Sequence, residues 1–273
     1  MERNLQQLNL GCGQRFLPHW TNLDFVGQEP SVRSHDLRKP LPFQDGRFAI
    51  VYHSHVLEHL TQHDARRLLR ECHRVLAPGG VLRVVVPDLE QKARLYLSKL
   101  ESVIQNAGET QRAEHEWMVI ETLDQIARTK PGGSMIDFMR SGRAEAFVRA
   151  RIGDEWERSR GADSQPQPSR PKFAARIRMK LRSKLRAFAL RVLGLDDADY
   201  DYLRFRRTGE LHLWMYDRAS LGEMLADTGF TECRTEGAAT SRIPNWTENG
   251  ASLDMEENTL RKPDSLYMEA VKR

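Results

Sequence analysis

Short apolar runs that end in glycine or in an acid open the chain. Leu5, Leu8 and Leu10 are spaced as in a short buried strand, and glycines follow at once. The pattern over 20–25 predicts a second strand with Asp24 at its carboxyl end. A third strand, with a weaker pattern, is predicted before Asp36. The spacing therefore predicts an open α/β sheet in which a ligand lies beyond the carboxyl ends of the strands.

The next segment has the pattern of a strand, a helix and a further strand. Residues 48–52 form an apolar run of the kind found in buried parallel strands. From 62 to 76, apolar residues recur every three or four positions, which places them on one helical face. The sequence Ala-Pro-Gly-Gly at 77–80 should end that helix, and 81–86 should be the next strand. This is a βαβ unit with parallel strands and a right-handed crossover.

The second half of the chain divides into an insertion and a return to the sheet. Residues 89–152 have a helical pattern, and 158–171 are a proline-rich linker. After 209, a helix over 220–229 and strands over 230–235 and 266–271 are expected. We therefore predict one domain from 1–90 and 209–273, interrupted by a helical insertion from 91–208.

A basic segment lies within the insertion. From 164 to 195 there are nine Lys and Arg residues and no acid, whereas the rest of the chain has 33 basic and 38 acidic residues. Residues 172–193 predict an amphipathic helix with an apolar stripe and a cationic remainder. It is suited to peripheral contact with an anionic membrane, or else to covering the domain that contains the sheet. We do not expect nucleic-acid binding, because the body of the chain is mildly acidic.

The cysteine content and the N-terminal sequence indicate the cellular compartment and argue against one kind of metal site. The three cysteines have no Cys-x-x-Cys spacing, which favours a reducing compartment and argues against structural zinc. The N-terminus lacks the profile of a signal peptide, and no apolar run is long enough to span a bilayer. We expect a cytoplasmic protein, with membrane association as an open alternative.

The glycine turn and the two acids indicate the ligand. Gly11 and Gly13 place no Cβ between the backbone and a molecule lying over the turn. A nicotinamide fingerprint requires a third glycine, but Phe16 stands at that position. Two carboxylates suit a ligand with ribose hydroxyls, an adenine amine and a positive charge, such as S-adenosylmethionine.

Four motifs carry a family resemblance. They are Leu-Asn-Leu-Gly-Cys-Gly at 8–13, Leu-Pro-Phe…Asp…Phe at 41–48, Val-Leu-Glu-His at 56–59 and Arg-Val-Leu-Ala-Pro-Gly-Gly-Val-Leu at 74–82. In this order and spacing the chain resembles class I S-adenosylmethionine-dependent methyltransferases of the type-11 group. The resemblance implies a Rossmann-like, doubly wound seven-stranded sheet, mostly parallel with the last strand antiparallel. The helical insertion would lie between the fifth strand and the final helix.

The resemblance also assigns roles to residues of the cofactor site. Gly11, Cys12 and Gly13 would lie under the methionine end, and Asp24 would accept hydrogen bonds from the ribose hydroxyls. Asp36, with Leu37 beside it, would face the adenine, and His53 and Ser54 would line the cofactor.

Methylation of a hydroxyl needs a base, and histidine titrates near neutral pH. His55 follows the fourth strand, and His212 lies in an apolar segment that should pass near the carboxyl ends of the strands. We therefore predict O-methylation of a small-molecule, sugar or glycolipid hydroxyl, with His55 and His212 as candidate bases. No metal is expected. Some O-methyltransferases bind a divalent cation through two acids and a histidine around the Glu-His at 58–59, but His55 replaces the first of those acids.

Asn9 and Arg15, where many members have an acid and a glycine, keep an alternative open. In that alternative a non-catalytic adaptor docks on a membrane or protein through the basic helix.

Overall fold

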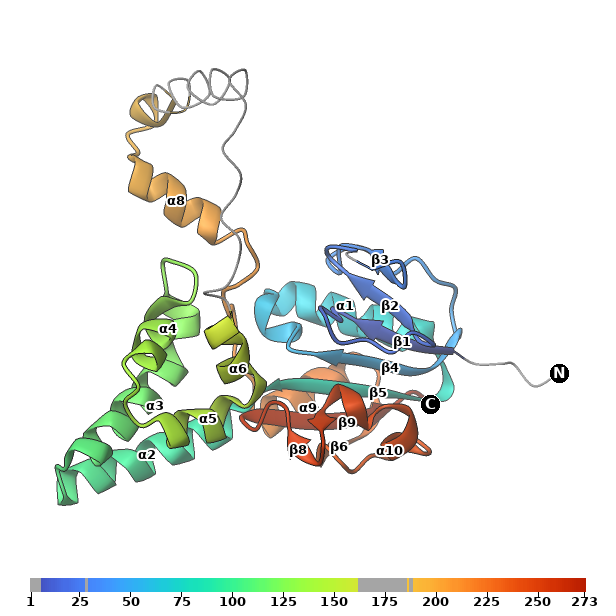
Figure 1. Ribbon diagram of the computed structural model, residues 1–273. Coiled ribbons are helices and arrows are strands. Elements are labelled where there is room, and N and C mark those ends of the chain that lie inside the picture. The colour runs from blue at the N-terminus through green and yellow to red at the C-terminus, as the bar shows by residue number, and fades with distance from the viewer. Residues whose placement is uncertain (1–5, 28, 162–185, 187–188) are drawn as a thin grey trace.

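The computed structural model describes residues 6–27, 29–161, 186 and 189–273, with only the backbone given for 158–161 and 249 (Figure 1). Of the predicted linker, 162–171 lie outside the described residues. The same holds for 172–185, 187 and 188 of the predicted basic helix. In the part that is described, no helix has both the length and the apolar character that crossing a bilayer requires.

Seven strands form one sheet in the order β3-β2-β1-β4-β5-β9-β6. Their bounds are Gln6–Leu10 (β1), Thr21–Asp24 (β2), Val32–Ser34 (β3), Phe48–Ser54 (β4), Leu76–Pro87 (β5), Thr231–Glu236 (β6) and Ser265–Val271 (β9). β9 is antiparallel to both of its neighbours, and the other pairs are parallel. The predicted fold class is confirmed.

The βαβ unit forms where the apolar spacing placed it. Helix α1 (Gln62–Val75) begins at Thr61, whose side chain accepts a hydrogen bond from the Asp64 amide. Its buried residues include Leu68, Leu69 and Cys72, which pack in the main core. The fifth strand begins earlier than predicted, at Leu76 rather than at 81, because Leu76 already pairs with Phe48 before the register shifts. The Pro-Gly-Gly sequence thus lies inside the strand.

The other face of the sheet is covered by the segment that precedes β9. This segment contains α10 (Trp246–Asn249), η3 (Ala251–Leu253), β7 (Met255–Glu256) and β8 (Thr259–Leu260). Arg83 of β5 is fully buried and donates to Asp254 Oδ2 at 2.9 Å and to Glu269 Oε1 at 2.8 Å. Removing one partner of such a buried pair would leave an uncompensated charge. Arg83 also donates to the Gly237 carbonyl oxygen, and it therefore holds residues 237–254 against the sheet.

The inserted helices lie beyond the carboxyl end of β5 (Figure 1). They are α2 (Leu89–Gln105), α3 (Glu109–Ala127), α4 (Gly133–Arg140), α5 (Glu145–Ile152) and α6 (Asp154–Gly161), and α8 (Asp197–Phe205) follows later. They have a core of their own that includes Trp117, Phe138 and Trp156. Lys92 of α2 is fully buried, with its Nζ 3.2 Å from Asp264 Oδ2, just before β9. The helices are thus joined to the sheet, and the division at 90/91 and 208/209 stays a prediction.

The chain returns to the sheet through α9 (Arg218–Asp227), close to the predicted helix. Asp217 and Ser220 form a reciprocal cap at its N-terminus, and Gly229 follows its C-terminal end with φ +101°. This helix leads into β6 and completes the order of strands.

Candidate functional site

The glycine turn lies directly after β1 and is held against β2. Gly11 and Gly13 have φ values of +63° and +53°, in the left-handed region that favours glycine. The Gly11 and Cys12 amides both donate to the Leu23 carbonyl oxygen, at 2.8 and 3.2 Å. A Cβ on Gly11 would collide with the Val56 side chain, whereas a Cβ on Gly13 would meet nothing within 4 Å. Gly11 is therefore required both by its backbone conformation and by the close contact with Val56, whereas Gly13 is required by its backbone conformation alone.

Asp24 lies at the carboxyl end of β2, beside this turn. Its Oδ2 accepts a hydrogen bond from the Gly13 amide at 2.8 Å, and its Oδ1 accepts one from Val26. Asp36 makes no such bond to the glycine turn among the described residues. Its carboxylate accepts two hydrogen bonds from the Arg38 guanidinium, which lower the pKa of Asp36. Leu37 packs against the main core. The structure thus brings Asp24 to the glycine turn and places Asp36 against Arg38, and their predicted roles stay predictions.

A cavity of about 890 Å³ separates the glycine turn from the inserted helices. Its volume falls within the usual range for small-molecule sites. From the sheet it is lined by residues that include Gly11, Cys12, Gly13, Ser54 and His55, and from the insertion by residues of α3, α4 and α6. Leu253, Glu256, Arg261 and Lys262 line it from the segment before β9. Asp24, Asp36, Leu37 and His53 are not among the lining residues.

The two histidines at the end of β4 differ in their surroundings. His53 is fully buried, neither ring nitrogen has a hydrogen-bond partner among the described residues, and burial lowers its pKa to about 4. His55 has φ +54° and lines the cavity. Its Nδ1 is 3.0 Å from Glu58 Oε1, and its Nε2 is 2.9 Å from Ser265 Oγ. Burial and the nearby Lys262 lower the pKa of His55, against the opposing effect of Glu58.

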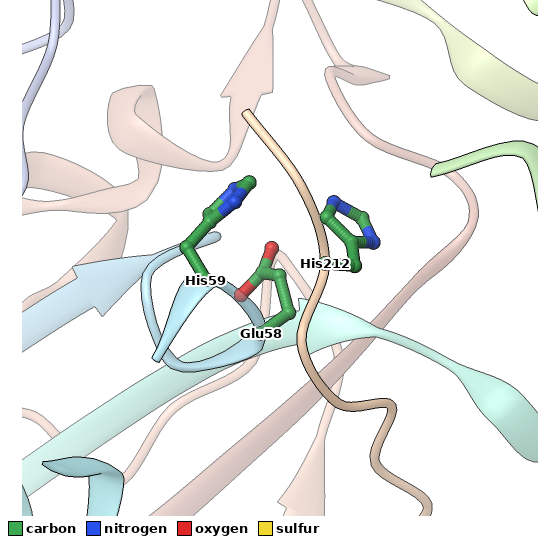
Figure 2. A group of neighbouring side chains, drawn as sticks. All are labelled: Glu58, His59 and His212. Carbon is green, nitrogen blue, oxygen red and sulfur yellow. The ribbon is translucent and has the colours of Figure 1, made fainter. Parts of the chain in front are cut away.

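Glu58, His59 and His212 lie close to one another (Figure 2). Glu58 and His59 belong to η1 (Leu57–His59), and His212 comes from the segment that precedes α9. The His59 and His212 rings meet edge to face with centroids 4.8 Å apart. Burial alone would raise the pKa of Glu58, but His55, His59 and His212 outweigh it and lower that pKa. Glu58 is therefore ionised, with the side chains of three histidines around its carboxylate.

Backbone hydrogen bonds hold His212 in place. Its amide donates to the Gln125 carbonyl oxygen of α3 at 3.0 Å, and the next two amides, of Leu213 and Trp214, both donate to the Glu58 carbonyl oxygen. The side chain is only 3% exposed, lies at the cavity wall, and has a pKa lowered by burial to about 3. The sequence singled out His55 and His212 but missed Glu58 as their shared neighbour. The signal was present, because Glu58 falls three residues after His55.

Residues 14–84 match the family model described as a methyltransferase domain. This segment, which runs from the end of the glycine turn into β5, is similar to methyltransferase domains. The suspected family is thereby confirmed, and the domain implies S-adenosylmethionine as cofactor. The glycine turn and the adjacent Asp24 fit such a ligand, since they combine a surface without Cβ atoms and a carboxylate at the end of the next strand.

Solved structures resemble the chain over different lengths. One chain of a complex that contains the Haloferax volcanii Trm112 methyltransferase activator is 12% identical with TM-score 0.38, over 99% of this chain and 83% of that one. A SAM-dependent methyltransferase of Thermotoga maritima is 11% identical with TM-score 0.39, over 98% and 82%. An S-adenosylmethionine-dependent methyltransferase of Mesorhizobium loti is 24% identical with TM-score 0.24, over 31% and 47%. Among curated proteins, no sequence matches this one.

Proposed function

We propose that this protein transfers a methyl group from S-adenosylmethionine to a hydroxyl oxygen of a small molecule, a sugar or a glycolipid. The observation that carries the proposal is the composition of one cavity. The glycine turn after β1 bounds it on one side, and His55, His59 and His212 line it as well. A cofactor over the turn and an acceptor beside the histidines would therefore share a single space.

The chain's own residues divide into two groups under this proposal. Gly11 and Gly13 leave room for the cofactor's methionine end, and Asp24 accepts hydrogen bonds from its ribose. When bound, S-adenosylmethionine supplies an activated methyl group for in-line displacement. Much of the rate of such a reaction comes from holding the acceptor oxygen in line with the methyl carbon. The cavity wall contributed by α3, α4 and α6 is suited to that positioning.

His55 is the residue we assign to the acceptor's proton. Its Nε2 contacts the Ser265 hydroxyl at 2.9 Å, which shows that this nitrogen can pair with a hydroxyl group. An acceptor hydroxyl in place of Ser265 would deliver its proton to Nε2. Glu58, 3.0 Å from Nδ1, would then stabilise the imidazolium. The predicted His212 is the second candidate, and its burial makes it the weaker base.

Two measurements test the proposal in order. Calorimetry with S-adenosylmethionine and with its demethylated product should show binding, and absence of binding at millimolar ligand would contradict the proposal and favour a non-catalytic adaptor. The bound protein is then incubated with methyl-labelled cofactor and cell-envelope extracts. A labelled methyl ether in the products supports O-methylation of a hydroxyl, and label recovered on nitrogen or carbon contradicts it.

A further inference from the structure

We propose that Glu58, His59 and His212 bind one divalent transition-metal ion of the zinc type at the cavity wall. Each residue offers one ligand atom, and these atoms lie within 4.8 Å of one another (Figure 2). Zinc bonds of about 2.0–2.2 Å place two ligands of one ion up to about 4 Å apart, so shifts on the order of 1 Å would close them onto it. This inference goes beyond methyl transfer and does not rest on it.

The first supporting observation is a set of buried atoms without hydrogen-bond partners. Glu58 is fully buried; its Oε1 is 3.0 Å from His55 Nδ1, and its Oε2 has no hydrogen-bond partner among the described residues. Nδ1 of His212 also lacks a hydrogen-bond partner in the part of the chain that the structure describes. Buried charges in proteins are paired or bind metals, because leaving water without compensation is costly. His55 contacts Oε1, but a carboxylate has about four lone-pair sites, which leaves room for a cation.

The second observation fixes which nitrogen of His59 carries a proton. His59 Nδ1 is 3.1 Å from the Leu211 carbonyl oxygen, which can only accept a hydrogen bond. Nδ1 therefore donates, and in the neutral ring Nε2 keeps its lone pair. A hydrogen bond from the far ring nitrogen to a backbone carbonyl is the usual support of a histidine that binds a metal.

Backbone contacts bring the three ligands together in the absence of an ion. The amides of Leu213 and Trp214 donate to the Glu58 carbonyl oxygen at 2.6 and 3.3 Å, and the His212 amide donates to α3. The segment carrying His212 is therefore bound across η1 on one side and to the insertion on the other. This arrangement fixes the distance between ligands that are far apart in the sequence.

The donor set selects the kind of ion. Two imidazoles and one carboxylate, with further positions open, form a set typical of catalytic zinc and of related divalent transition metals. His59 and His212 both line the cavity, so the open positions would face it. An oxygen-containing ligand in the cavity could then reach the ion.

The test is a zinc titration of the full chain after treatment with EDTA, followed by calorimetry. We expect one Zn²⁺ per chain in the wild type and a loss of affinity of at least about 100-fold in His212→Ala and in His59→Ala. His63→Ala is the matched control, because the His63 side chain is 87% exposed and lies just past η1. Wild-type affinity in both ligand variants, or no stoichiometric binding by the wild type, would overturn the proposal.

A second measurement uses the wild-type protein alone, so it tests the site even if a ligand variant fails to fold. Zn²⁺ that binds the native state should raise the wild-type Tm relative to the EDTA-treated protein. An unchanged Tm at saturating Zn²⁺ would overturn the site. S-adenosylmethionine binding is measured separately in EDTA, so a failure of the metal site and a failure of the proposed methyl transfer are distinguishable.

Discussion

Gly13 and Asp24 meet where β1 and β2 end, through a 2.8 Å hydrogen bond from the Gly13 amide to Asp24 Oδ2. The carboxylate of the second strand thus fixes the turn of the first. It also remains partly exposed, so it can face a ligand that lies over the turn. One side chain therefore shapes the glycine turn and is suited to bind a ligand that lies over it.

Asp24→Ala should weaken S-adenosylmethionine binding about 10- to 100-fold. Hydrogen bonds to a charged group contribute about 1.5–3 kcal/mol, and 1.4 kcal/mol corresponds to a factor of ten in affinity. Calorimetry measures the effect, with Asp24→Asn as a control that keeps one acceptor oxygen for the backbone. Unchanged affinity in Asp24→Ala would show that the ribose lies elsewhere.

Alanine at Gly11 should destabilise the fold more than alanine at Gly13. Both positions have a left-handed backbone, which costs a residue with a Cβ about 1–2 kcal/mol. At Gly11 the new methyl group also collides with Val56, and such overpacking adds about 1–3 kcal/mol. Urea denaturation of the two variants gives the comparison, and equal losses would rule out a close contact with Val56.

His55→Asn should lower the turnover of methyl transfer by at least about 100-fold, as loss of a general base usually does. Cofactor affinity should stay unchanged, since the proposed function assigns His55 to the acceptor and not to the cofactor. The rate is measured with the acceptor identified in the extract screen, and exposed His63→Asn serves as control. Normal turnover in a folded His55→Asn protein would remove His55 from the mechanism.

The link between Glu71 and Arg74 should make stability depend on pH. Two hydrogen bonds from Arg74, at 2.7 and 2.9 Å, lower the pKa of Glu71, with a further bond from the Leu41 amide. Because the folded pKa is depressed, this stabilisation is present above the unfolded pKa and is lost as pH falls through the folded value. Glu71→Gln should cost about 1–3 kcal/mol at pH 7.

The difference between wild type and Glu71→Gln should then shrink as the pH is lowered below the unfolded pKa of about 4.3. Urea denaturation at pH 7, 5 and 3.5 measures it. Glu223→Gln, at an exposed position of α9, should show little change at any pH. A difference that persists unchanged at pH 3.5 would mean that Glu71 acts through packing rather than charge.

The basic segment 172–193 should bind vesicles only if they contain anionic lipid, and binding should fall with added salt. Each Lys or Arg near such a surface contributes about 1 kcal/mol. Co-sedimentation of the full chain with anionic and neutral vesicles tests this, and replacing Lys180, Arg182 and Lys184 by Gln is the matched variant. Equal binding to neutral vesicles, or none to either, would favour a helix that covers the domain.

The sequence by itself determined the elements whose signals are local. The apolar spacing from 62 to 76 placed α1 almost to the residue, and the run at 48–52 marked β4. The order of acids and glycines located the turn after β1 and the carboxylate after β2. These features depend on backbone periodicity and on single residues with restricted conformations, so they can be inferred without knowing what lies across the fold.

The tertiary structure decided which distant residues share an environment. Leu211, which accepts the hydrogen bond of His59, lies 152 residues further along the chain, and no local pattern links the two. The same is true of Arg83 and Asp254, separated by 171 residues, whose pairing brings the segment before β9 onto the sheet and to the cavity. Contacts of this kind depend on how the insertion packs on the sheet. Periodicity marks which faces of an element are buried, but it does not specify their partners.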